Sequence, residues 1–444
     1  MDFLDLLLFP IYVALFYFIF SARRKNYTDP ILKHYHKQGF WIKIFAVLAF
    51  TFFNTKLSIG DSLLLYYGEG ANFSRMILHD FSHINLLYQP SASFDEGLLW
   101  DSSNAGYLKN ENNYMVVRFS AVFSFFTFRS YLILNLFFSM LSFTGVWKLY
   151  RFFYEQYPHL HKQLAIAILY LPTFAFWSSG VLKDPICTGA MGWLTYALYE
   201  ALYKKKDLLK NFVIAFISAY LLSVIKVYIL VSYLPFFILF LVLKNVNLLK
   251  SFWLRIVFVL GLIVFSILMF TRIMDKLTGT LGAYGGSDVT KNVSIYQKAF
   301  AEQEDAGSTF SLGVEYDGSI QSLVKIAPAA IVATLFRPFV WETRKLSTLL
   351  TSFESLVVMF FTLSVLFKAK PANFMRAIRK DPTILYCLLF ALLFSVFVGA
   401  TTPNFGTLVR YKIPCMPFYI IALYLIQDRT QKAKNSPVVS GTVV

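Results

Sequence analysis

Residues 164–177 read LAIAILYLPTFAFW, and residues 357–367 read VVMFFTLSVLF. Similar runs recur from one end of the chain to the other, and several approach the roughly 20 apolar residues that cross a bilayer. Of the 444 residues, 57% are hydrophobic and only 15% are charged, whereas about 25% of the residues in an average soluble domain are charged. This composition excludes a soluble globular protein, a disordered chain and a secreted disulfide scaffold. We therefore expect an all-α fold, a polytopic transmembrane helical bundle.

Hydropathy predicts about 11 spans. They cover 3–21, 41–58, 130–150, 164–182, 185–203, 211–224, 229–244, 252–271, 346–367, 383–401 and 413–427. Residues 211–244 form either one broken helix or two helices. We expect a single polytopic membrane domain over 1–427, followed by a polar, disordered cytoplasmic tail over 428–444.

Lysine and arginine are unevenly divided between the two sets of connecting segments. More than half of the 41 basic residues, with Lys43 counted among them, fall in or beside alternate loops. These loops cover 22–40, 151–163, 204–210, 245–251, 368–382 and 428–434. Because cytoplasmic loops carry the excess of Lys and Arg, the N-terminus is expected outside and the C-terminus in the cytoplasm. The net charge of +16 is then a topology signal, and no nucleic-acid partner is expected.

Two outer segments, 59–129 and 272–345, are too long to be simple connectors. Long loops without regular structure are uncommon unless they serve a function. Each segment ends in an apolar run, 114–128 and 326–341, that is amphipathic enough to lie in the membrane interface or to re-enter the bilayer. We expect the two segments to pack together as an outer cap over one cavity.

Ionisable groups at membrane depth are costly and are therefore candidate functional residues. The candidates, all on the outer side, are Asp61, Lys183 with Asp184, Lys226, Arg337 with Glu342, and Arg410 with Lys412. Each has a structural alternative: a helix cap, a turn, a side chain that snorkels to the interface, or a headgroup anchor. Their joint placement favours function, because a bidentate arginine suits a phosphate or diphosphate at a bilayer surface. Glu354 is the one acid deep in a span.

Metal chemistry has little support in the sequence. The three cysteines show no CxxC or Cys/His spacing, so neither zinc nor a disulfide framework is indicated. His79 and His83 can share a helix face, but third and fourth ligands are not evident. We therefore expect no metal site.

The stretch GDSLLLYY (60–67), the short helix VVRFSAVFSFF (116–126) and the segment YLPTFAFWSSGVLKD (170–184) together resemble the GT-C type of integral membrane glycosyltransferase. The resemblance covers mainly residues 55–245 and is one of layout. It implies that Asp61, in a GD-x-x-x-x-Y context with Tyr66, is the catalytic base. It also implies that Arg337, Arg410 and Lys412 contact the phosphate of a polyprenyl-linked donor.

The chain departs from that family in two respects. It has an extra helix before the acidic loop, and a single Asp stands where an acidic pair is usual. A divalent metal is therefore in doubt, and no cofactor is expected. The stretches FRPFVWE (336–342) and GTLVRYKIPCMPF (406–418) also resemble O-antigen-polymerase-like families. With FWSSGVLKD (176–184), the chain is similar to Bacteroidetes-type envelope proteins.

Three functions stay open at this point. The first is a glycosyltransferase at the outer face of a bacterial inner membrane, with a polyprenyl-linked sugar or glycan donor and a glycan, lipid or protein acceptor. The second is an O-antigen-polymerase or ligase-like enzyme, in which the arginines hold the diphosphate and Asp61 is structural. The third is a transporter or a subunit of an envelope complex. The absence of an inverted repeat and of a charged pathway across the midplane argues against the third.

Overall fold

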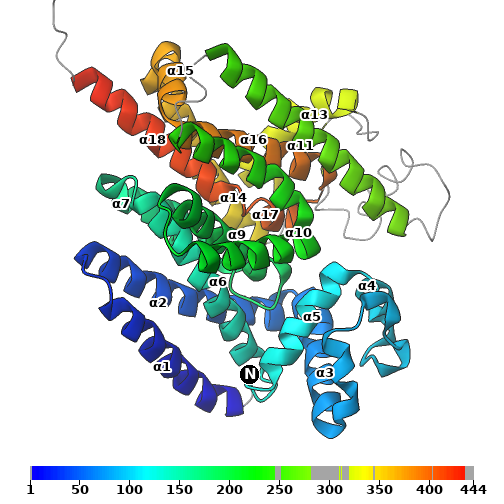
Figure 1. The fold of residues 1–444 in the computed structure, drawn as a ribbon. Helices are drawn as coiled ribbons and strands as arrows, with labels where there is room; N and C mark the ends of the chain where they lie inside the picture. The colour runs from blue at the N-terminus through cyan, green and yellow to red at the C-terminus, as the bar shows by residue number, and fades with distance from the viewer. Residues whose placement is uncertain are drawn as a thin grey trace, which may run out of the picture. The chain divides into compact units, whose positions relative to one another are not determined.

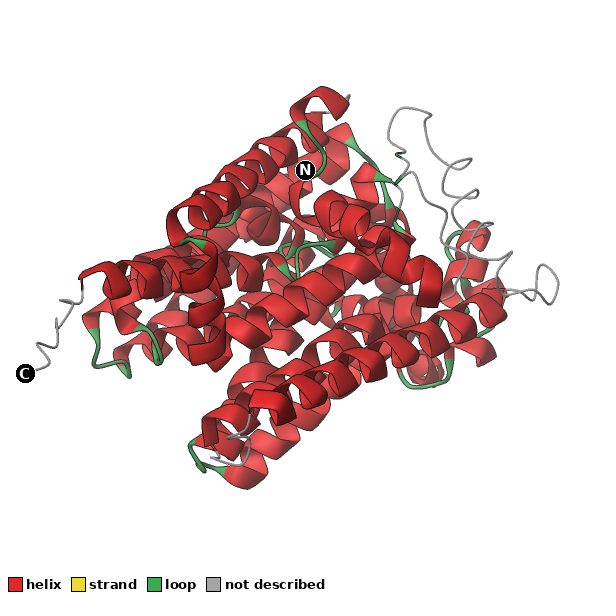
Figure 2. Cartoon of the chain, turned by 90° about the horizontal axis from the view of Figure 1, so that it is seen from above, coloured by secondary structure: helices red, strands yellow, loops and turns green. Residues whose placement is uncertain are grey.

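The computed structural model describes residues 3–245, 252–281, 310, 312, 320–343, 346–402 and 404–435. Within these ranges the regular elements are helices joined by loops, and no strand occurs (Figure 2). This confirms the expected all-α fold. The helices form two compact units, Met1–Leu230 and Val231–Val444.

The first unit is built around a central buried helix, α6. Its long helices are α1 (Phe3–Lys25), α2 (Pro30–Phe52), α6 (Tyr131–Tyr154), α9 (Lys183–Leu198) and the first part of α10 (Leu208–Asn245). Two short helices, α7 (His161–Ile168) and α8 (Pro172–Trp177), precede α9. The start of α2 is set locally: the Asp29 carboxylate accepts a hydrogen bond from the Ile31 amide at 2.8 Å, and Pro30 occupies the first helical position.

Three glycines allow α6 and α9 to touch backbone to backbone. A Cβ added at Gly145 would lie 2.0 Å from the carbonyl oxygen of Gly189, and one added at Gly192 would lie 1.9 Å from that of Gly145. Membrane helices associate through such small residues. Because lipid is as apolar as the side chains, the association is stabilised by close van der Waals packing and not by the hydrophobic effect. The backbone contact between α6 and α9 therefore depends on these glycines.

We expect Gly145→Ala to lower the free energy of unfolding by about 1–3 kcal/mol, the usual cost of overpacking. Gly261 in α11 (Phe252–Leu281) is the matched control, because an added Cβ there has no atom within 4 Å. Thermal unfolding of the two purified variants checks the prediction. Equal midpoints for Gly145→Ala and Gly261→Ala would contradict the close contact.

Residues 53–124 of the first unit form a folded helical lobe (Figure 1). Its elements are η1 (Phe53–Leu57), η2 (Ser62–Tyr67), α3 (Gly68–His79), η3 (Phe81–Leu87), η4 (Ser91–Ser93), η5 (Glu96–Leu98), η6 (Ser102–Asn104), α4 (Ala105–Leu108) and α5 (Glu111–Ser124). The buried Glu69 carboxylate accepts hydrogen bonds from the amides of Trp100 and Asp101 and from the Asn104 side chain, at 2.8–3.1 Å. These bonds close the lobe, so the predicted outer loop 59–129 is an ordered structure.

The second unit contains the rest of α10 and the helices that follow. These are α11, α13 (Ile320–Phe336), η11 (Val340–Glu342), α14 (Leu346–Ala369), α15 (Pro371–Lys380), α16 (Pro382–Thr401), α17 (Phe405–Tyr411) and α18 (Met416–Asn435). Helix α13 packs against α16, where an added Cβ on Gly399 would lie 2.4 Å from the Ala330 carbonyl oxygen. About half of the second predicted outer segment lies outside the described residues, namely 282–309, 311, 313–319 and 344–345, as does 436–444 of the predicted tail.

Among the described residues, six helices are long and apolar enough to cross a membrane, or up to seven if the bent pair α17 and α18 is one span. The protein is therefore a multi-pass membrane protein in contact with a lipid bilayer. The prediction of about 11 spans included segments that the structure divides differently. Residues 164–182 contain α7 and α8 with breaks between and after them, and 211–244 lie in the single element α10, interrupted at Lys226.

Candidate functional site

The chain leaves helical geometry between α8 and α9, at residues 178–182, which we call the helix break. Leu182, the residue just before α9, has φ −146° and ψ 171°. Gly180 lies against the ring of Phe50 from α2, where any Cβ would fall 1.9 Å from a ring carbon. Irregular backbone inside a membrane protein is tolerated only where other groups satisfy its hydrogen bonds. The partners of the helix break therefore identify the polar centre of the first unit.

Lys43, in the middle of α2, provides the first of these partners. Its side chain is buried, and Nζ donates to the Ser178 carbonyl oxygen at 2.7 Å, to Ser178 Oγ at 2.5 Å and to Ser179 Oγ at 3.2 Å. An ammonium group has three donors, and three oxygens accept them here. The ammonium lies at the C-terminal end of α8, where helix carbonyl groups favour a cation.

The sequence pattern had grouped Lys43 with the cytoplasmic basic residues, and this part of the site was missed. The structure places it inside a helix that is long and apolar enough to span the membrane. A lysine within the predicted span 41–58 was the available signal. Because Lys43 lies close to the start of that predicted span, it was counted with the basic residues of the preceding loop.

Asp184 and Lys226 form a buried ion pair at the other side of the helix break. Nζ of Lys226 lies 2.5 Å from Oδ1 of Asp184, and the two side chains are 3% and 1% exposed. Asp184 stands in the first turn of α9, where the helix dipole favours an anion. Lys226 has the non-helical angles φ −147° and ψ 71° that interrupt α10. The structure thus brings together two residues that the sequence had named separately.

Lys183 connects the helix break to the lobe. Its Nζ donates to the side-chain oxygen of Asn112 in α5 at 3.1 Å. The first residue of α9 therefore contacts the lobe, while the next residue, Asp184, contacts α10.

Helix α6 presents a polar stripe, Tyr131, Asn135, Ser139 and Ser142, to these elements. The Asn135 side-chain oxygen accepts from the Val181 amide at 2.8 Å, and its nitrogen donates to Thr51 Oγ1 at 2.9 Å. Ser139 donates to Ser179 Oγ at 3.1 Å. The spacing of three and four residues keeps the stripe on one helix face. Its polar side chains satisfy backbone and hydroxyl groups of the helix break.

The stripe also reaches the start of the lobe, where the predicted base lies. The Tyr131 hydroxyl is 2.8 Å from Ser62 Oγ, and Ser62 follows Asp61. Asp61 is exposed at the N-cap position of η2, and its side chain makes no capping bond to that helix. Tyr66 is 2% exposed and donates to the Asn113 side-chain oxygen at 2.9 Å, within the core of the lobe.

In the second unit, Arg337 and Glu342 form a bidentate ion pair. Nε of Arg337 lies 3.0 and 3.1 Å from the two carboxylate oxygens, and Nη2 also bonds to Oε1. The guanidinium carbon stands 4.4 Å from the ring centre of Phe310 and 5.1 Å from that of Phe405. The Arg337 guanidinium, which was expected to bind a phosphate, thus binds the carboxylate of Glu342, five residues further along the chain.

Lys412 joins the same cluster, whereas Arg410 is half-buried in the last turn of α17. Nζ of the buried Lys412 donates to the Arg337 carbonyl oxygen at 3.1 Å and to Ser355 Oγ at 2.8 Å. Glu354, the acid predicted deep in a span, is half-buried in α14. Arg337, Glu342 and Lys412 therefore form one group, which we call the arginine cluster.

We expect Arg337→Lys to lower the free energy of unfolding by about 1–2 kcal/mol, because lysine keeps the charge but cannot form the fork to Glu342. Arg376→Lys is the control, since Arg376 is exposed and donates a hydrogen bond to the nearby Asn373 side chain. Thermal unfolding of the two purified variants checks the prediction. An unchanged midpoint for Arg337→Lys would contradict a stabilising role of the fork to Glu342.

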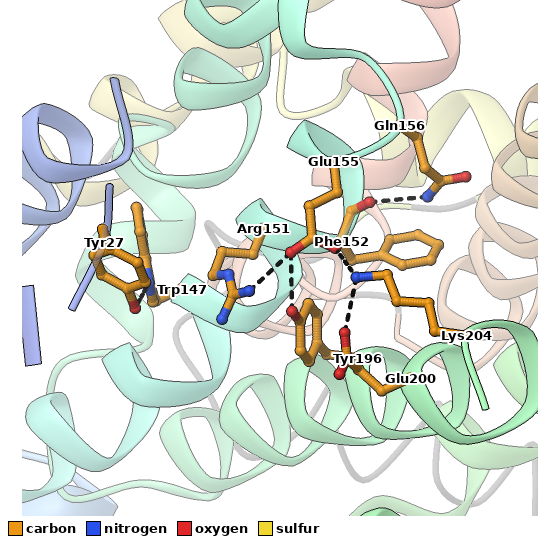
Figure 3. A network of polar contacts seen from close by, with 9 residues as sticks. All are labelled: Tyr27, Trp147, Arg151, Phe152, Glu155, Gln156, Tyr196, Glu200 and Lys204. Atoms are coloured by element: carbon orange, nitrogen blue, oxygen red, sulfur yellow. Dashed lines mark hydrogen bonds and ion pairs between the residues drawn. The ribbon is translucent and has the colours of Figure 1, made fainter. Parts of the chain in front are cut away.

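A second charged network lies at the C-terminal end of α6 (Figure 3). Glu155 accepts from Arg151 at 2.8 Å and from the Tyr196 hydroxyl at 2.9 Å, and Lys204 bonds to both Glu155 and Glu200. Burial favours the neutral form of Lys204, but its two carboxylate partners outweigh this effect and raise its pKa above the usual value. The network joins α6 to α9 and to η8 (Tyr199–Tyr203). Its charges compensate one another, which is typical of a structural connection.

Within the described ranges, no group of three or more His, Cys, Asp or Glu side chains is placed to hold a metal ion. His79 ends α3, and His83 lies beside Asp80 at 4.0 Å. The helix break, with Lys43, Asp184 and Lys226, and the exposed Asp61 are thus the candidate sites of the first unit. Comparison of the chain with protein-family models, with curated proteins and with solved structures finds no match.

Proposed function

We propose that the protein is a membrane glycosyltransferase that takes a sugar or glycan from a polyprenyl-phosphate carrier, for assembly of a cell-envelope glycan. The observation that carries the proposal is the position of Asp61, an exposed carboxylate between η1 and η2 of the lobe that follows α2. A general base must come within about 3 Å of the hydroxyl that it deprotonates. An exposed carboxylate beside a membrane-spanning helix can meet the acceptor hydroxyl of a lipid-linked or soluble glycan.

The carrier phosphate is proposed to contact Arg337, Arg410 and Lys412. The arginine cluster supports this role in part: Nε and Nη2 of Arg337 face Glu342, and the opposite edge of the guanidinium has no partner among the described residues. Cations near a departing phosphate would stabilise the charge that develops on it. In the first unit, Lys183, Asp184, Lys226 and Tyr66 are proposed to support the substrate through the contacts described above, and in the second unit Glu342 is proposed to hold Arg337.

The proposed topology keeps the full set of about 11 spans, with 59–129 and 272–345 at the outer face of the bacterial inner membrane. The N-terminus is periplasmic and the C-terminus cytoplasmic, as the distribution of Lys and Arg indicates. Cysteine labelling at residue 2 and at residue 207 should report opposite sides of the membrane. Labelling of both from the same side would contradict this topology.

A transporter is the second candidate, and the helix break favours it. Broken helices whose ends carry compensating charges are a recurring way to build ion and substrate sites within the membrane. The sequence had argued against a transporter because no charged pathway was evident. Buried Lys43 and the Asp184–Lys226 pair supply charges that this argument did not include.

Removal of the gene tests the proposal directly. A glycosyltransferase should leave its lipid-linked donor and unmodified acceptor to accumulate, and mass spectrometry of extracted lipids should show a glycan that lacks the transferred unit. Purified protein in detergent should then restore transfer from that extracted donor. A transporter cannot act in detergent, so absence of transfer by well-folded protein would favour the second candidate.

A further inference from the structure

A groove of about 480 Å³ opens on the first unit beside the N-terminal half of α2. It is lined by His34, Lys37, Gln38, Trp41, Ile42 and Tyr170. His34, Lys37, Gln38 and Trp41 are spaced by three and four residues, so they share one face of α2. Tyr170, between α7 and α8, forms the opposite wall and donates a hydrogen bond to the Gln38 side chain. The groove therefore belongs to one unit and has two distinct walls.

The same face of α2 changes character along its length. His34 and Lys37 are exposed, and beyond them Trp41, Phe45, Leu48 and Phe52 are 47%, 73%, 38% and 58% exposed. These apolar residues continue the spacing of three and four. From Trp41 to Phe52 the helix rises about 16 Å, close to half of the roughly 30 Å hydrocarbon core of a bilayer. On this face of α2 the cationic residues are thus followed by an exposed apolar strip about as long as one bilayer leaflet is thick.

We propose that this groove binds an anionic phospholipid of the surrounding bilayer. The headgroup phosphate contacts Lys37 and His34, and an acyl chain lies along Trp41 and the exposed apolar residues that follow it. The charge is complementary, because a lysine near the membrane surface contributes about 1 kcal/mol of attraction to anionic lipid. A soluble phosphate would leave the apolar strip unused. The lipid site does not depend on the proposed glycosyltransferase activity.

The test uses the purified full-length protein in detergent micelles. Dioleoyl phosphatidylglycerol and dioleoyl phosphatidylcholine are titrated separately, and native mass spectrometry measures the lipid-bound fraction. We expect the anionic lipid to bind at least about tenfold more tightly than the zwitterionic one, and the double variant His34→Ala/Lys37→Ala to lose most of this preference. Trp41→Ala should weaken the binding of both lipids.

Lys25→Ala is the matched control, since Lys25 is an exposed lysine at the end of α1, five residues before α2 begins, and does not line the groove. It should leave lipid preference unchanged. Circular dichroism melting of all variants verifies that these surface changes preserve the fold. Equal binding of the two lipids, or an unchanged preference in the double variant, would overturn the proposal. Displacement of the lipid by 10 mM inorganic phosphate, about a tenfold excess over a millimolar site, would show a simple anion site and also overturn it.

Discussion

Replacing Asp61 by asparagine is expected to lower glycan transfer by about 10²–10⁴-fold, the usual contribution of a general base. Asparagine has nearly the same shape but cannot accept a proton from the acceptor hydroxyl. Because Asp61 is exposed, the change should have little effect on folding. The rate of transfer from the extracted lipid-linked donor is the quantity to measure. The loss should appear in the chemical step, with the binding of donor retained.

Asp95→Asn is the matched control on the same lobe. The exposed Asp95 caps η5 by accepting a hydrogen bond from the Gly97 amide at 2.9 Å, and asparagine caps a helix equally well. This control should transfer glycan at the parent rate. Normal transfer by Asp61→Asn would remove Asp61 from the mechanism and leave an enzyme that relies on its arginines.

Replacing Asp184 by alanine is expected to lower the free energy of unfolding by about 3–5 kcal/mol, the cost of leaving one charge of a buried pair without its partner. Lys226 is only 3% exposed, so its ammonium cannot reach water without local opening of α10. Lys226→Met should cost a similar amount, because it leaves the equally buried Asp184 carboxylate without its partner. The double variant Asp184→Leu/Lys226→Met should recover most of the loss, since two apolar groups can replace a buried pair at little cost.

Asp428→Ala provides the comparison for a pair that is partly exposed, because the Asp428 side chain is 15% exposed and its partner reaches the surface. Lys432 lies 2.8 Å from Asp428 in α18 and is 56% exposed, so loss of this pair should cost about 0–1 kcal/mol. Thermal unfolding of the detergent-purified variants ranks the three cases. If Asp184→Ala unfolded at the same temperature as Asp428→Ala, the ion pair at the helix break would have no special role in stability.

The helix break shows where sequence reasoning reaches its limit. Pro172 marks the start of α8 and is visible in the sequence. The departure from helical geometry at 178–182 has no comparable local cause, and hydropathy predicted one span over 164–182. What holds it open comes from distant residues: Phe50 occupies the space beside Gly180, Asn135 accepts the Val181 amide, and Lys43 binds the serines. These contacts exist only once α2 and α6 have packed.

The candidate residues divide in the same way. Arg337 and Glu342 were predicted as one group because they are five residues apart, and their pairing is a local matter. Asp184 and Lys226 were recognised as costly charges, but 42 residues separate them, and only the packing of α9 against α10 makes them partners. Lys43 was misplaced because a charge count treats every lysine near a predicted loop alike.

By itself the sequence determined the class of the protein, an all-helical chain that crosses the membrane several times. The reason is physical: long apolar runs must leave water, and in lipid each backbone amide and carbonyl must find a partner within its own helix. The tertiary structure alone decided where helices break, which glycines meet and which buried charges pair. These outcomes depend on side chains that meet across helices, and a pattern read along one chain does not contain those distances.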